Sequence, residues 1–105
     1  NITNYSTQPT RRIDLVVGVS YNANIQQVKT ELLAIAAADE RVLRDQEVTV
    51  GVVELADSSV NFVFRPWVQS ADYWNVYFDL NERVKTRFDE LGIEIPYPQM
   101  DIHKK

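Results

Sequence analysis

Few side chains in this chain could do acid–base or nucleophilic chemistry, and none of them stands in a catalytic pattern. His103 is the only histidine and lies in a charged tail. Adjacent carboxylates occur at Asp39–Glu40 and Asp89–Glu90. General acid–base catalysis needs two groups that converge on one cleft, whereas neighbours in sequence point apart. We therefore predict that both acidic pairs are solvated surface and that the chain is not an enzyme.

Cofactor and metal sites lack their usual signatures as well. The absence of cysteine excludes thiolate metal ligands, disulfides and cysteine nucleophiles. The glycines Gly18, Gly51 and Gly92 are isolated, so no glycine-rich loop could cradle a phosphate. The carboxylates between residues 39 and 45 lack the spacing of a calcium loop. We predict no catalytic site, no cofactor and no metal.

Nucleic-acid binding is the alternative that the aromatic residues raise. The chain has 11 Lys and Arg against 15 Asp and Glu, and its net charge of −4 would repel phosphate backbones. Phe62 and Phe64 alternate on a predicted strand, where RNA-recognition modules place stacking rings. The surrounding residues VNFVFR lack the basic and glycine positions of that motif, and core packing explains both rings. A stand-alone ferredoxin-like module that binds a ligand or RNA stays as the alternative function.

A second group of aromatic residues is too rich for one helix face. It consists of Trp67, Tyr73, Trp74, Tyr77 and Phe78. Some of these rings must belong to the core. A helix that is aromatic on more than one side needs cover on more than one side, so we expect Trp74 or Phe78 to contact another subunit.

The apolar periodicity predicts the elements that position these residues. Ile13, Leu15, Val17 and Val19 alternate with other residues and predict a strand with one fully apolar face. Asn24 and Gln27 resemble a capping box and predict the start of a helix that ends near Asp39. Residues 39–46 are then a connecting loop, anchored by Val42 and Leu43.

The second half of the chain repeats this alternation of strand and helix. Residues 48–56 and 59–68 predict a hairpin, in which Pro66 bends the second strand or marks an edge. Ser70 or Asp72 can cap a second helix, which Gly92 ends. Short strands are predicted at 93–95 and 99–102.

This order of elements indicates an α+β fold, a ferredoxin-like βαββαβ two-layer sandwich with an extra C-terminal strand. Two helices can cover only one face of its sheet. The other face, with residues such as Val16, Gly18 and Val63, is left to water, another domain or another subunit.

The C-terminal tail favours assembly. After Gly92 the chain reads GIEIPYPQMDI, and Pro96 and Pro98 hold it extended. An extended tail that carries Tyr97, Met100 and Ile102 would be a sticky edge on a monomer, and such edges are normally paired or covered. The tail therefore suggests pairing with other copies of the chain.

Length and composition indicate one soluble globular unit. We divide its 105 residues into a linker or last strand of a preceding domain (1–10), an α/β domain (11–95) and a C-terminal strand with tail (96–105). No apolar run approaches the roughly 20 residues that cross a bilayer. The chain starts at Asn1, so we expect it to be a fragment of a longer protein. We expect the fragment itself to be soluble.

Several motifs, in order, resemble the cytoplasmic C-terminal region of the small-conductance mechanosensitive channel (MscS) family of bacterial inner membranes. The likeness covers nearly the whole chain. It rests on ITNYS (2–6), RR (11–12), VGVSY (17–21), Ile25 with Val28, SSVNF (58–62), RPW (65–67) and above all GIEIPYPQMDI (92–102).

The resemblance implies a homoheptamer in which these domains form a hollow cytoplasmic cage with side openings for solutes and ions. It implies that residues 1–10 hold the last strand of a truncated middle β domain. It also implies that residues 96–105 are a barrel strand with tail, in which Tyr97, Gln99, Met100 and Ile102 lie in a small barrel that closes the cage. We assign Trp67 and Trp74 to intersubunit or interdomain packing. The resemblance also implies roles in solute filtering and gating in hypoosmotic stress. Upstream transmembrane helices, absent from this chain, would supply the membrane contact, so the fragment cannot conduct ions alone.

Overall fold

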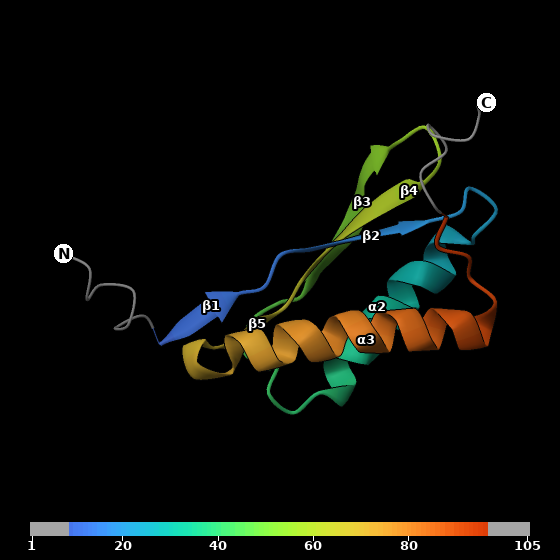
Figure 1. Ribbon diagram of the computed structural model, residues 1–105. Coiled ribbons are helices and arrows are strands. Elements are labelled where there is room, and N and C mark those ends of the chain that lie inside the picture. The colour runs from blue at the N-terminus through green and yellow to red at the C-terminus, as the bar shows by residue number, and fades with distance from the viewer. Residues whose placement is uncertain (1–8, 97–105) are drawn as a thin grey trace, which may run out of the picture.

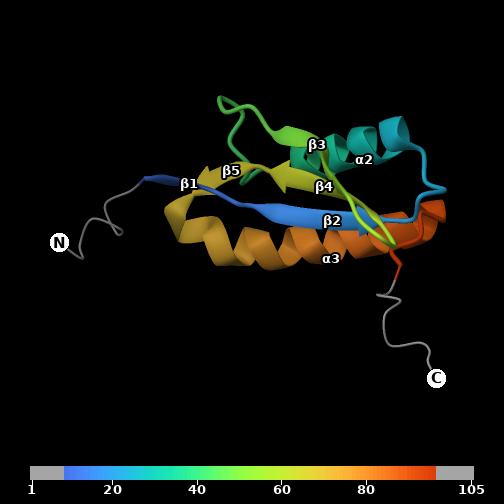
Figure 2. The ribbon, with the colours of Figure 1, turned by 90° about the horizontal axis from the view of Figure 1, so that it is seen from above.

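The computed structural model describes residues 9–96, which form a layer of strands with two helices on one side of it (Figures 1 and 2). The elements are β1 (Thr10–Arg12), β2 (Leu15–Val19), α2 (Ile25–Ala38), β3 (Thr49–Leu55), β4 (Val60–Arg65), β5 (Trp67–Gln69), the 3-10 helix η1 (Ser70–Asp72) and α3 (Tyr73–Leu91). The predicted α+β class and two-layer arrangement are confirmed.

The strands form two antiparallel sheets. The larger has the order β2-β4-β3, and the smaller pairs β1 with β5. Val17 and Val52 both lie opposite Phe62 on the central strand β4, and the register of β3 shifts between Val52 and Glu54. In chain order, β2, β3 and β4 take the places of the first three strands of the ferredoxin-like prediction.

The strand predicted at residues 93–95 is wrong, because the structure has no strand between Gly92 and Pro96. This segment is held by isolated contacts and not by the regular hydrogen bonds of a paired strand. The Ile93 side chain is buried, and the Ser20 N–H donates to the Glu94 carbonyl at 2.9 Å. Pro96 has no N–H to add. The extra strand predicted at 99–102 lies outside the described residues.

Pro66 divides the predicted second hairpin strand, as expected, into β4 and β5. Pro66 has no N–H for a sheet ladder, but its carbonyl accepts a hydrogen bond from the Ile13 N–H at 2.8 Å. After this break β5 leaves the larger sheet and pairs with β1. The sheet therefore bends at Pro66, and the β1–β5 ribbon lies at the end where α3 begins (Figure 1).

The core lies between the larger sheet and the helices, and the strand periodicity predicts it correctly. Leu15, Val17 and Val19 are buried, whereas Val16 on the opposite face is 66% exposed. From the helices, the fully buried side chains are Val28 and Leu32 of α2 and Val76, Leu80 and Phe88 of α3. Burial of these apolar surfaces is the main source of stability.

The helix ends agree with the sequence in part. The Gln27 N–H donates to Asn24 Oδ1 at 2.9 Å, which confirms the predicted cap of α2. At α3, Asp72, one of the two residues predicted to cap the helix, does not act as a side-chain cap. Asp72 precedes the helix, but its side chain makes no capping hydrogen bond, since α3 continues directly from the 3-10 turn η1.

Replacing Gly92 by alanine should lower the free energy of unfolding by about 1–2 kcal/mol, because Gly92 ends α3 with φ 73° and a Cβ is disfavoured in that region. Urea denaturation would measure the loss. The matched control is Gly51→Ala. A Cβ on Gly51 meets open space in a strand, so this change should be neutral or stabilise by about 0.5–1 kcal/mol. Equal losses in both variants would contradict the assignment.

Candidate assembly surface

Four aromatic rings lie together on the first two turns of α3, and we call Tyr73, Trp74, Tyr77 and Phe78 the aromatic surface. Helical spacing brings residues four apart together, so Tyr73 lies near Tyr77 and Trp74 near Phe78. The centroids of these two pairs are 6.0 and 5.8 Å apart. Tyr73 also meets Trp74 edge to face at 4.9 Å. The rings therefore form one continuous cluster.

The two sides of this cluster have different environments. Tyr73 and Tyr77 pack partly against the core. Trp74 and Phe78, in contrast, are 56% and 60% exposed. The rings thus fall into two groups, one partly buried against the core and the other facing outward. The two exposed rings form an apolar patch of the kind that marks interaction sites, while their contact with another subunit stays a prediction.

Arg11 extends the aromatic surface onto β1. Strand pairing sets Arg11 opposite Val68, and its guanidinium carbon lies 3.7 Å from the centroid of the Tyr73 ring. A cation over an aromatic ring at this distance is attracted by the ring quadrupole. Sequence reasoning missed this contact, because the Arg11–Arg12 pair gave no sign of which ring, 62 positions further on, would lie beneath it.

Of the remaining predicted interface residues, the structure describes only Trp67. Trp67 is half-buried on β5, opposite Arg12, and its carbonyl accepts a hydrogen bond from the Leu43 N–H at 2.8 Å. Its position fits a ring that packs partly against its own chain. The predicted barrel residues Tyr97, Gln99, Met100 and Ile102, and His103 in the tail, lie outside the described residues.

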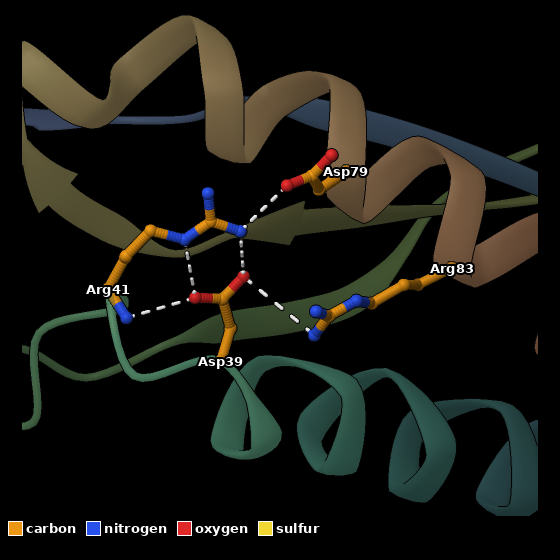
Figure 3. A network of polar contacts seen from close by, with 4 residues as sticks. All are labelled: Asp39, Arg41, Asp79 and Arg83. Carbon is orange, nitrogen blue, oxygen red and sulfur yellow. Dashed lines mark hydrogen bonds and ion pairs between the residues drawn. The ribbon is translucent and has the colours of Figure 1, made fainter.

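Asp39 is not the solvated surface residue that the sequence predicted. Its side chain is only 3% exposed and accepts a two-pronged hydrogen bond from Arg41, at 2.9 Å to Nε and 2.8 Å to Nη2 (Figure 3). Arg41 also donates to Asp79 on α3 at 2.9 Å. The Arg83 guanidinium lies 3.8 Å from Asp39. The loop after α2 is thereby joined to α3 by charge. The other predicted surface carboxylates, Glu40 and Asp89–Glu90, are exposed as expected.

These contacts shift the pKa of both partners. The hydrogen bonds from Arg41 lower the pKa of Asp39, although burial of the carboxylate acts in the opposite direction. The hydrogen bonds to Asp39, followed by those to Asp79, raise the pKa of Arg41. Both groups are therefore charged at neutral pH. The sequence offers no signal for this pair, since an Asp and an Arg two positions apart in a loop are usually solvated.

The rings behind the RNA-binding alternative are not available to a ligand. Phe62 and Phe64 are both completely buried beneath the helices. A base can stack only on a ring that it can reach, so neither residue can act as a stacking platform. Within residues 9–96 there is also no group of three His, Cys, Asp or Glu side chains that could hold a metal ion.

Comparison with known proteins relates this architecture to channels. Residues 13–95 match the family model described as "Mechanosensitive ion channel MscS, C-terminal". The small-conductance mechanosensitive channel of Edwardsiella ictaluri is 52% identical over 103 residues, which are 98% of this chain and 36% of the relative. The channel of the same name from Helicobacter pylori is 33% identical over 103 residues, 97% of this chain and 38% of the relative. The chain thus spans little more than a third of these curated relatives.

Solved structures agree. The crystal structure of H. pylori MscS in the closed state superposes with a TM-score of 0.83 at 32% identity and covers 93% of this chain and 39% of that one. Arabidopsis thaliana MSL1 has the same fold, with a TM-score of 0.76 at 11% identity over 89% of this chain and 37% or 36% of the two MSL1 chains compared. No helix within residues 9–96 is long and apolar enough to span a membrane. The chain belongs to the MscS family of mechanosensitive channels.

Proposed function

We propose that this chain is the non-catalytic cytoplasmic cage domain of a mechanosensitive channel, assembled as a homoheptamer at the cytoplasmic face of the bacterial inner membrane. Membership of the MscS family supports a role in a channel. In this proposal the cage filters solutes and takes part in gating during hypoosmotic stress, and the transmembrane helices belong to the part of the relatives that this chain does not span.

The observation that carries the assembly role is the exposed half of the aromatic surface. Trp74 and Phe78 expose more than half of their side-chain surface although both rings are large and apolar. Large aromatic side chains are enriched at the centres of protein interfaces, where they contribute most of the binding energy. A second copy of the chain is the partner we propose, with Trp67, Tyr97, Gln99, Met100 and Ile102 as further contacts.

Replacing Trp74 and Phe78 together by glutamine should weaken self-association of the chain more than tenfold. Each substitution removes a large aromatic ring, the kind of side chain that dominates binding energy at interface hot spots. Sedimentation velocity over a concentration series would measure the oligomer. Leu33→Gln is the matched control, since Leu33 is 45% exposed on α2, away from the aromatic surface. A wild-type chain that stays strictly monomeric, or a control that weakens association equally, would contradict the proposed interface.

The channel role is tested in the full-length protein. Cells that lack their own mechanosensitive channels and express the full-length protein should survive an abrupt osmotic downshift. Cells that express it with the Trp74→Gln and Phe78→Gln changes should survive less well, at equal amounts of membrane protein. Survival no better than that of cells without any channel would count against the proposed function.

A further inference from the structure

A groove separates the outer sides of the two helices. It has a volume of about 660 Å³, and its lining includes Ala34, Ile35 and Ala38 of α2 and Arg83 and Thr86 of α3. The two alanines on α2 have short side chains, so they leave the space open that a larger side chain would fill. Ile35 also belongs to the hydrophobic core, together with Leu80 and Val84 of α3, so apolar packing joins the two helices at the floor of the groove.

Three ion pairs join the helices along the groove and at its end, and we call them the ionic clasp: Arg87 with Glu31 at 3.0 Å, Arg83 with Asp39 at 3.8 Å, and Arg41 with Asp79 at 2.9 Å. Both members of the first pair line the groove, whereas Asp39 and Arg41 lie in the loop after α2. Each pair has one member on α3 and the other on α2 or in the loop that follows it. Glu31 pairs with Arg87 and Asp39 with Arg83, so the two helices run antiparallel. The clasp extends over about two turns of α3, from Asp79 to Arg87, and on the other side from Glu31 of α2 to the loop after that helix (Figure 3 shows its Asp39 end).

The clasp lies where dissolved salt can reach it. The side chains of Arg83 and Arg87 are 47% and 45% exposed, and that of Asp79 is also 47% exposed. Ions screen the attraction between exposed charges, and the Debye length falls from about 30 Å at 0.01 M to about 3 Å at 1 M salt. Asp39 and its hydrogen bonds with Arg41 are more buried and are therefore screened less.

We propose that the ionic clasp makes the spacing of α2 and α3 depend on ionic strength, so that the groove is narrow in dilute salt and widens as salt rises. The buried side chains of the core hold the two helices in the fold throughout. Only the outer sides of the helices separate, because there the attraction is carried by screened charges across open space.

This dependence has a direct physiological counterpart if the chain serves in an osmotically gated channel, which rests on the proposed function. Entry of water dilutes the ions of the cytoplasm. Dilution would strengthen the ionic clasp and draw the helices together, so a cage built from this domain would stiffen when the ionic strength falls. The clasp is a property of the single chain, however, and can be measured without any assembly.

The test uses the absence of cysteine from the chain. Cysteines replace Ala34 and Thr86, which line the groove from opposite helices, and carry spin labels whose separation is measured by pulsed electron resonance. We expect the mean distance to increase by about 1–2 Å, and its distribution to broaden, between about 0.01 M and 1 M KCl. Sucrose at matched osmolality should have no effect, because it does not screen charge.

Two controls make the result specific. An Arg83→Gln, Arg87→Gln variant removes two of the three clasp pairs and retains the pairs of Arg41 with Asp39 and Asp79. In this variant the distance in dilute salt should be larger than in the wild type, and its response to salt should be smaller. Labels at Asn75 and Lys85, both on α3, should not respond to salt. An unchanged distance between Ala34→Cys and Thr86→Cys in the wild type, or an unchanged salt response in the glutamine variant, would overturn the ionic clasp. A monomeric chain would overturn only the proposed assembly.

Discussion

Phe62→Ala should lower the free energy of unfolding by about 3–5 kcal/mol, a larger loss than we expect from replacing any exposed side chain. Phe62 lies on the central strand β4 between Val17 and Val52, and its side chain is fully buried. Truncating the ring removes apolar contacts from the middle of the core and leaves a cavity that rigid strands on both sides cannot close. Urea denaturation followed by circular dichroism would measure the change.

Phe78→Ala is the matched control, because it removes the same atoms from a ring that is 60% exposed. Measured on dilute monomer, it should change the free energy of unfolding by no more than about 0.5 kcal/mol. If Phe62→Ala proves too unstable to purify, Phe62→Leu keeps most of the volume and should lose less stability. Similar losses at Phe62 and Phe78 would contradict the division between core and assembly surface.

The sequence predicts most of the fold because the strands and helices of this chain have clear periods. In β2, Leu15, Val17 and Val19 alternate with exposed or small residues, and a two-residue period allows only one buried face. The hairpin around Asp57 and the left-handed Gly92 at the end of α3 likewise depend on neighbouring residues alone. Such local patterns determine the elements and the side that each one buries.

Features that depend on distant residues could not be predicted in the same way. Whether residues 93–95 form a strand is decided by how well the chain meets β2, and only the hydrogen bond between Ser20 and Glu94 is made. The stacking of Arg11 on Tyr73 depends on the pairing of β1 with β5. Local composition favours an extended chain or a solvated charge at these positions, and tertiary packing then selects the outcome.

The candidate assembly surface falls between these two cases. A helix with rings at positions 73, 74, 77 and 78 has more aromatic surface than one buried face can take, which is evident from the spacing. Which ring is exposed depends on how the helix is rotated against the sheet. Val76 and Leu80 are fully buried, and this rotation leaves Trp74 and Phe78 on the outside.

Asp39→Asn should lower the free energy of unfolding by about 2–3 kcal/mol at pH 7. The carboxylate is buried, and an amide cannot accept both of the charged hydrogen bonds that Arg41 donates. The expected loss is below that of a fully buried ion pair, since Arg41 is one-third exposed and keeps Asp79 as a partner. Chemical denaturation of both proteins would measure it. Asp89→Asn removes a carboxylate from the exposed pair with Lys85 and should cost less than about 1 kcal/mol.

The pH dependence of the stability difference between wild type and Asp39→Asn distinguishes the loss of a charge from a disturbance of packing. The pKa of Asp39 in the folded protein is lowered from its ordinary value of 3.8, so the folded state favours the ionised carboxylate. The stability that this group contributes is therefore fully present above about pH 4–5, and it is lost as the pH falls through the lowered pKa. The difference between wild type and Asp39→Asn should shrink in that acidic range. A difference that is equal at pH 7 and at pH 3 would mean that the asparagine disturbs packing, and that the charge on Asp39 contributes little.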